Sequence, residues 1–161
     1  MTKMGKLFYN ICYKAGMFLG RHKWLYYTLS FTWGIIGTVL GGLVLLICAM
    51  IGGNLGTYNG HLMVFIGNNW GGLELGCGFL VARYMGTEYT MHTIMHESGH
   101  NYQNAIFGPF VIFLCFIPGA IRYWYRLIGT KHGKEFKTPY DGIWFEASAT
   151  DIGTSLYGKE K

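Results

Sequence analysis

The residues with the clearest capacity for chemistry form a short motif in the second half of the chain. His96 and His100 are four residues apart and Glu97 follows the first of them, which gives the pattern H-E-x-x-H. On a helix, side chains four residues apart share a face, so both imidazoles can reach one metal ion at about 2.0–2.1 Å. The glutamate then lies beside the ion, where it can take a proton from a zinc-bound water that attacks a carbonyl group. The motif predicts a Zn²⁺ site with His96 and His100 as ligands and Glu97 as general base.

A catalytic zinc ion usually takes a third protein ligand, and the sequence offers two candidates. Residue 106 is isoleucine, so the pattern with a third histidine six residues after the motif is excluded. Glu146 is favoured because it lies in an apolar segment, where a buried carboxylate is costly unless a cation pairs with it. Asp141 is the alternative, in a Thr-Pro-Tyr-Asp-Gly sequence that partly matches the aspartate element of site-2-type intramembrane proteases. A third interpretation leaves Glu146 exposed on an amphipathic helix.

Other polar side chains could assist the same chemistry. Asp151 could orient a ligand histidine from behind, although Thr150 holds the position four residues after Glu146 where such an aspartate is more usual. His92, one turn before the motif, is more typical of a structural histidine than of a ligand. An oxyanion also needs a hydrogen-bond donor. The sequence does not rank the three candidates for this role, which are Tyr102, His132 and Tyr140.

Three segments must bring these residues together. Residues 87–107 are predicted to form the motif helix, which should end or kink at the following Gly-Pro pair. Before it, residues 54–86 alternate turn formers with short apolar runs, which predicts a small β hairpin or ribbon. Residues 143–157 are predicted to form the helix that carries Glu146. The small residues after Glu146 should let this helix pack tightly near Gly99.

The composition predicts a membrane protein. Hydrophobic residues make up 51% of the chain and charged residues only 13%, about half the usual charged fraction. Residues 28–53 carry no charge and are long enough for one transmembrane helix. Residues 1–27 interleave basic and apolar side chains, which predicts a basic amphipathic helix on a membrane surface. Residues 110–128 are apolar over a shorter stretch that Pro118 interrupts, which predicts a re-entrant or second membrane helix.

Charge and topology narrow the possible partners. Lysine and arginine outnumber aspartate and glutamate by 13 to 8, but the basic residues flank apolar runs and form no continuous stripe. This pattern favours contact with a lipid bilayer and disfavours nucleic acid. Two full membrane crossings would place His96 and Glu146 on opposite sides of the bilayer. A single metal site therefore favours a re-entrant path for residues 110–121.

From about Asn68 to Gly153 the chain resembles small bacterial integral membrane proteins of unassigned function. The resemblance is carried by HESGHNYQNAIFGPF and the later WFEASAT, which fit an H-E-x-G-H-x-x-Q core, a Gly-Pro step and a W-x-E-x-x-A element. It implies a gluzincin-like zinc site made by His96, His100 and Glu146, with Glu97 as the base, in a bacterial cell membrane. It implies no particular substrate.

Together these observations predict a mainly α membrane protein in two parts. Residues 1–53 would form an amphipathic helix and transmembrane anchor, and residues 54–161 a membrane-associated zincin-like domain. The expected function is a zinc-dependent peptidase that cleaves a peptide or membrane-protein substrate. The alternatives are a site-2-type intramembrane protease and a non-catalytic membrane subunit that retains a metal-binding motif.

Overall fold

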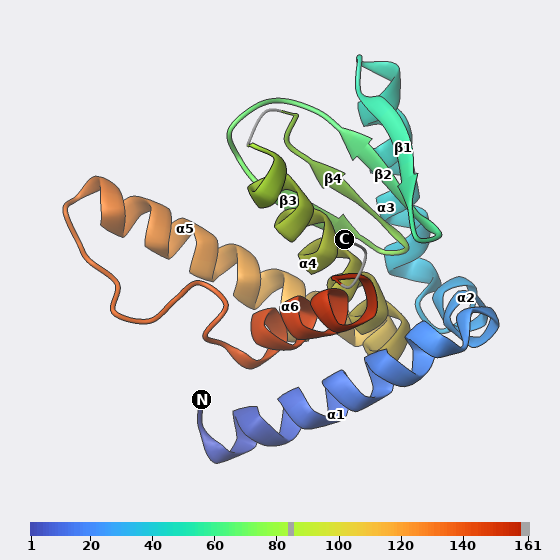
Figure 1. The fold of residues 1–161 in the computed structure, drawn as a ribbon, viewed down its shortest axis with the longest axis horizontal. Helices are drawn as coiled ribbons and strands as arrows, with labels where there is room; N and C mark the ends of the chain where they lie inside the picture. The colour runs from blue at the N-terminus through green and yellow to red at the C-terminus, as the bar shows by residue number, and fades with distance from the viewer. Residues whose placement is uncertain (84–85, 159–161) are drawn as a thin grey trace.

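The computed structural model describes residues 1–83 and 86–158 and consists of helices with a small β sheet on one side (Figure 1). The expectation of a mainly α protein is confirmed, as are the helices that carry the motif and Glu146. A 3-10 turn η1 (Gly108–Phe110) and a π-helical segment η2 (Ile112–Phe116) lie between the fourth and fifth α helices. The α helices are α1 (Lys3–Arg21), α2 (Lys23–Phe31), α3 (Ile35–Met50), α4 (Thr87–Phe107), α5 (Ile117–Lys131) and α6 (Trp144–Tyr157).

The sheet is larger than the predicted hairpin or ribbon. Its four strands are β1 (Asn54–Tyr58), β2 (His61–Phe65), β3 (Gly72–Leu75) and β4 (Gly78–Val81), in the order β1-β2-β4-β3. The pairs β1–β2 and β3–β4 are antiparallel hairpins, and β2 pairs with β4 in parallel. The two hairpins join because β2 and β4 carry buried apolar side chains that pack between α3 and α4. This arrangement leaves β3 as an edge strand.

Helix α4 is the central element, with α6 against one side and β3 and β4 against another. Two glycines permit the close approach of α4 and α6. A side chain at Gly99 would collide with the backbone carbonyl of Ala149, and one at Gly153 would collide with that of Met95. The tight packing predicted near Gly99 is therefore present, and it brings Glu146 to the motif.

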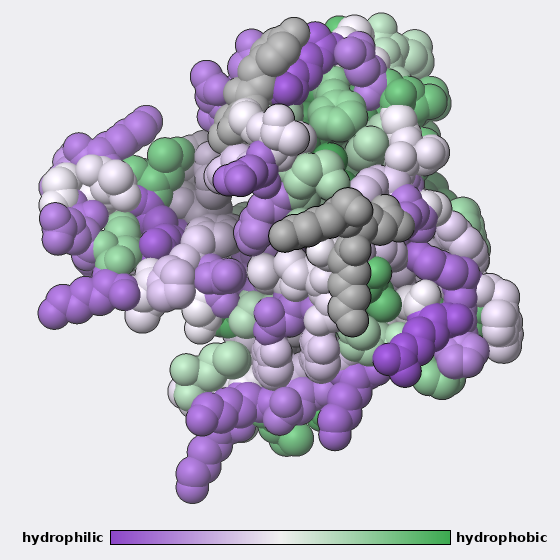
Figure 2. Space-filling model, viewed as in Figure 1, coloured by the Kyte–Doolittle hydropathy of each residue, from purple (hydrophilic) through white to green (hydrophobic). Residues whose placement is uncertain are grey.

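The amino-terminal helix packs into the rest of the protein. Helix α1 lies along α6 and contacts α4, and its Cys12 and Leu19 share a buried cluster with Tyr102 and Ile152. Residues 1–53 and 54–161 thus share a core. The opposite face of α1 exposes an apolar stripe among basic residues, as an amphipathic helix would. The stripe consists of Met4, Leu7, Ile11 and Phe18. Hydrophilic residues gather along α1 and at the far end of α5 and its loop (Figure 2).

The uncharged segment 28–53 is divided between two helices, so the prediction of one transmembrane helix there is wrong. Helix α2 ends at Phe31, α3 begins at Ile35, and their axes differ by 88°. At the break, Asn104 of α4 packs against the backbone at Gly34 and Gly37 and donates a hydrogen bond to the Gly34 carbonyl. In residues 1–83 and 86–158 no helix alone has both the length and the apolar character to cross a bilayer. Two bent pairs of helices, α2 with α3 and α4–η1 with η2–α5, have this length and apolar character when each pair is taken together.

The chain reverses direction after the motif helix. Gly108 has a φ of +55°, and the axes on either side of this region differ by 115°. The re-entrant path expected for residues 110–121 stays a prediction. Helix α5 then projects from the body of the protein (Figure 1), and its first turns face the same cleft as α4.

Candidate metal centre

Side chains of α4 and α6 meet at one point. The Nε2 atoms of His96 and His100 are 3.1 Å apart, and Glu146 Oε2 lies 3.1 Å from the first and 3.3 Å from the second. Tetrahedral ligands about 2.0–2.1 Å from a zinc ion lie roughly 3.3 Å from one another. The three donor atoms therefore have the spacing of a metal site, and the structure brings together the three residues expected as ligands.

Each ligand histidine is oriented by a partner on its other ring nitrogen. Nδ1 of His100 lies 2.8 Å from Oε1 of Gln103, and Nδ1 of His96 lies 2.8 Å from Oγ1 of Thr150. An amide oxygen can only accept, so Nδ1 of His100 donates to Gln103, and Nε2 is the ring nitrogen that faces Glu146. Gln103 also donates from its amide nitrogen to the carbonyl of Phe145, at 2.6 Å. Gln103 thereby links His100, one expected ligand, to Phe145, which precedes the expected ligand Glu146.

Positive charge near the buried Glu146 stabilises its carboxylate form. Burial raises the pKa of Glu146, but the hydrogen bonds and charges of His100 and His96 outweigh this effect and hold that pKa well below its usual range. Burial lowers the pKa of His100, but the hydrogen bond to Glu146 and its charge outweigh burial and raise the pKa to about 9. Burial lowers the pKa of His96. A proton on His100 balances the carboxylate here, and a divalent cation could take its place.

Glu97 lies between the cluster and the edge strand. Its Oε1 would be 2.6 Å from any Cβ at Gly72, so this glycine lets β3 pass close to the carboxyl group. Glu97 is 6% exposed, and burial raises its pKa to about 8. Glu74 of β3, which the sequence analysis did not single out, is half-buried and lines the cleft, and desolvation of its carboxyl group raises its pKa to about 7. The alternation of apolar and polar residues in Leu-Glu-Leu was the available signal for its position.

These residues open into a cleft of about 720 Å³ between β3, α4, α5 and α6. Tyr140 and Asp141 line it. Tyr140 is held there by Arg122 of α5, which donates to its carbonyl and to that of Pro139 at 2.8 Å each. Burial, and then the charge of Glu146 and a hydrogen bond to it, raise the pKa of the Tyr140 hydroxyl. Asp141 is outside the converging group of donor atoms, where Glu146 holds the third position.

Three other candidates lie away from the cluster. Tyr102 projects from a different side of α4, where its hydroxyl accepts a hydrogen bond from Lys23 at 2.8 Å. His132 follows the end of α5 and is exposed. Asp151 accepts a hydrogen bond from Tyr9, because five residues along a helix turn it away from the face that carries Glu146.

Thr150 and Gln103 have roles that the sequence analysis did not assign. Thr150 follows Glu146 by four residues and therefore shares its face of α6, where it contacts His96. Gln103 follows His100 by three residues and contacts it on α4. Helical spacing was the available signal for both. His92 lines the cleft, with its ring centre 6.4 Å from that of His96.

The chain matches no family model, no curated protein and no solved structure. The resemblance to small bacterial membrane proteins stays a prediction.

Proposed function

We propose that this protein is a membrane-bound, zinc-dependent peptidase. The observation that supports this function most strongly is the convergence of His96, His100 and Glu146 at 3.1–3.3 Å beside the buried Glu97. Two neutral imidazole nitrogens and one carboxylate form a ligand set of catalytic zinc sites. The cleft leaves space beside them for a substrate.

Zinc fits the donor atoms in type, number and spacing. His96, His100 and Glu146 would hold it, with Thr150 and Gln103 fixing the orientation of the two rings. When bound, zinc would polarise the substrate carbonyl and make an attacking water more acidic.

Glu97 and Tyr140 have complementary parts in the proposed reaction. A bound zinc ion would favour the ionised form of the buried Glu97 side chain. The Glu97 carboxylate then takes the proton of the attacking water and passes it to the leaving amine. Tyr140, at the cleft wall near Glu146, donates its hydroxyl hydrogen to the oxygen of the attacked carbonyl as negative charge develops there. Arg122 holds the backbone of Tyr140 in position for this step.

The edge strand supplies a binding surface for the substrate backbone. Within the described part of the chain, strand β3 pairs only with β4, and Gly72, Leu73 and Glu74 line the cleft. An extended peptide can hydrogen-bond to the free edge of such a strand. The absence of a side chain at Gly72 lets β3 itself lie against Glu97, so a peptide paired with β3 would run beside the proposed base.

Membrane attachment is proposed from the exposed apolar surface of α3. Most residues of this 16-residue helix are aliphatic, and many are more than half exposed. An exposed apolar area of this kind is typical of contact with lipid or another protein. The apolar stripe of α1, flanked by lysines, suits a lipid headgroup region. We therefore propose that α3 and α1 contact the bilayer.

The test is the Glu97→Gln variant of the full chain, purified in detergent. Wild type should cleave an apolar peptide presented in the same detergent, and the variant should keep its zinc while cleavage falls by about 10²-fold or more. Metal analysis beside the cleavage assay separates loss of the base from loss of the site. If the Glu97→Gln variant cleaved the substrate at the same rate as wild type, the result would favour the non-catalytic interpretation of the motif.

A further inference from the structure

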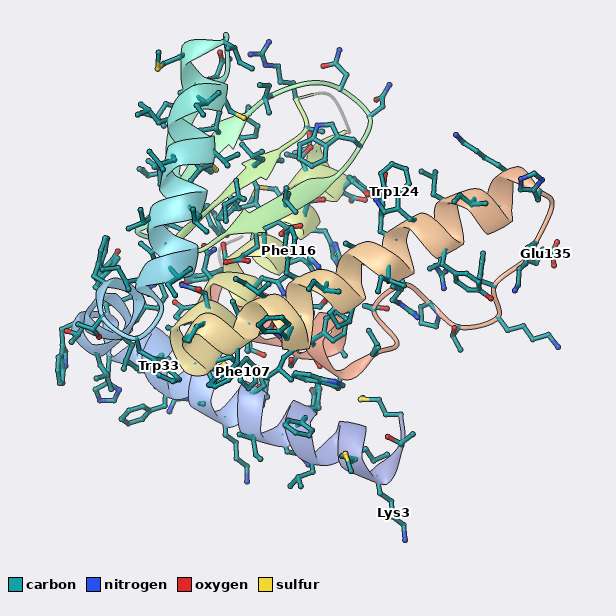
Figure 3. All side chains as sticks on the ribbon, turned by 180° about the vertical axis from the view of Figure 1, so that it is seen from behind. Lys3, Trp33, Phe107, Phe116, Trp124 and Glu135 are labelled. Atoms are coloured by element: carbon teal, nitrogen blue, oxygen red, sulfur yellow. The ribbon has the colours of Figure 1, made fainter. Side chains whose placement is uncertain are left out.

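An exposed apolar surface continues from α3 to α5. At the break before α3, Trp33 packs against Phe110 with ring centres 6.0 Å apart, which joins α3 to the segment that leads into α5. Figure 3 shows α3, η2 and α5 on the same side of the protein, with Trp33 at the base of α3. We call this surface the apolar face. On α3 and along η2 and α5 its exposed residues include Ile36, Val39, Leu40, Leu43, Leu46, Ile47, Phe113, Ile117, Ile121, Trp124 and Ile128.

The mouth of the cleft lies within the apolar face. Phe116 and Trp124 line the cleft and are also 48% and 58% exposed, and both are seen on this side in Figure 3. Across the cleft, Leu73 of the edge strand is 37% exposed. Apart from His92, the exposed residues that line the cleft are aromatic or aliphatic. A mouth that admitted water-soluble peptides would not need to expose this much apolar surface.

The edge strand indicates the kind of molecule that enters. In residues 1–83 and 86–158, β3 has a strand on one edge only, and the backbone of Glu74 hydrogen-bonds to the Glu97 side chain. An extended polypeptide in the cleft can add hydrogen bonds along the other edge of β3, which a lipid chain cannot. Side chains of that polypeptide would alternate between the interior of the cleft and its mouth. Those at the mouth would contact Phe116, Trp124 and Leu73.

We propose, building on the peptidase function, that the substrate is an apolar polypeptide segment that enters the cleft directly from the bilayer. The segment unwinds at the apolar face and lies along β3, with its apolar side chains against Phe116 and Trp124. The outer edge of β3 replaces part of the backbone hydrogen bonds that the segment loses when it unwinds. The apolar face thus serves both membrane attachment and substrate entry.

The test measures binding to the zinc-loaded Glu97→Gln chain in phosphatidylcholine–phosphatidylglycerol vesicles. The probe is a fluorescent 20-residue (about one bilayer span) transmembrane peptide, beside a water-soluble version with polar central residues. The apolar peptide should bind at least about tenfold more tightly, since several apolar side chains are buried. Equal or tighter binding of the polar version would overturn the proposal.

A pair of variants locates the binding. Phe116→Ser should weaken binding of the apolar peptide about tenfold, because it removes an aromatic ring at the mouth. Phe113→Ser is the matched control, since Phe113 is 66% exposed on the same surface but does not line the cleft. It should change binding less than about twofold. Equal effects of the two substitutions would overturn entry at this mouth.

The same preparations distinguish this proposal from the peptidase function. Binding of the apolar peptide at Phe116 without cleavage by zinc-loaded wild type would support the entry route and contradict the peptidase. Cleavage confined to the polar peptide would support the peptidase and overturn entry from the bilayer.

Discussion

Oε1 of Gln103 accepts a hydrogen bond from Nδ1 of His100 at 2.8 Å, which directs Nε2 of that ring toward Glu146. Because Gln103 also donates to the carbonyl of Phe145, one amide side chain fixes a ligand on α4 and the start of α6 together. The proposed metal site thus depends on a buried residue that does not touch the metal position.

Replacing Gln103 with leucine should weaken zinc binding. Leucine has about the volume of glutamine but lacks the acceptor that orients His100, so we expect a 10- to 100-fold loss of zinc affinity. Competition with a chromophoric chelator measures it. Ser148→Ala is the control, since Ser148 contacts the Gln103 amide and not His100. If both variants bind zinc as wild type does, Gln103 does not orient a ligand.

Thr150 and Asp151 offer a comparison between neighbouring residues. Thr150→Val removes the hydroxyl group that contacts Nδ1 of His96 and should lower zinc affinity about tenfold. Asp151→Asn should leave zinc affinity within about twofold of wild type, because Asp151 bonds to Tyr9 and not to His96. The same chelator titration compares them. A larger effect at Asp151 would restore the role expected from the sequence.

The close packing of α4 and α6 should make Gly99 intolerant of a side chain. Gly99→Ala places a methyl group against the backbone of Ala149 and should destabilise the protein by about 1–3 kcal/mol. Gly42 of α3 has open space around it, so Gly42→Ala should leave stability unchanged or raise it by up to about 1 kcal/mol. Thermal unfolding in detergent compares them, and equal unfolding temperatures would contradict the packing argument.

The sequence predicted the expected metal ligands better than it predicted the contacts and elements around them. Helical spacing was enough to place His96 and His100 together, and an acidic residue among apolar ones identified Glu146. Spacing of five residues, by contrast, could not show that Asp151 turns toward Tyr9. The backbone at the break between α2 and α3 packs against Asn104, which is far away in the chain. The parallel pairing of β2 with β4 is likewise a non-local contact.

Acidification should destabilise the fold through His61, which has no exposed surface. Burial, and then the charge of Lys23, lower the pKa of His61 to about 3, against about 6.5 in the unfolded chain. Between these values the unfolded chain binds a proton that the folded chain does not, so stability falls as the pH drops. From pH 6.5 to 5 the loss should be about 2 kcal/mol.

Chemical unfolding with excess chelator, at both pH values, measures this loss in wild type and in His61→Gln. The groups that surround His61 are Lys23 and Tyr26 from α2, Asn101 and Tyr102 from α4, and Tyr157 from α6. They remain in the variant, which should lose less stability on acidification. An identical loss in both proteins would show that other groups cause it.

The most direct test of the central claim is the zinc content of the purified chain. Wild type should hold about one zinc ion per chain. Glu146→Ala should lose most of it, while Asp141→Ala, which alters the cleft wall but not the cluster, should keep it. Full zinc content in Glu146→Ala, or its loss only in Asp141→Ala, would contradict the proposed site.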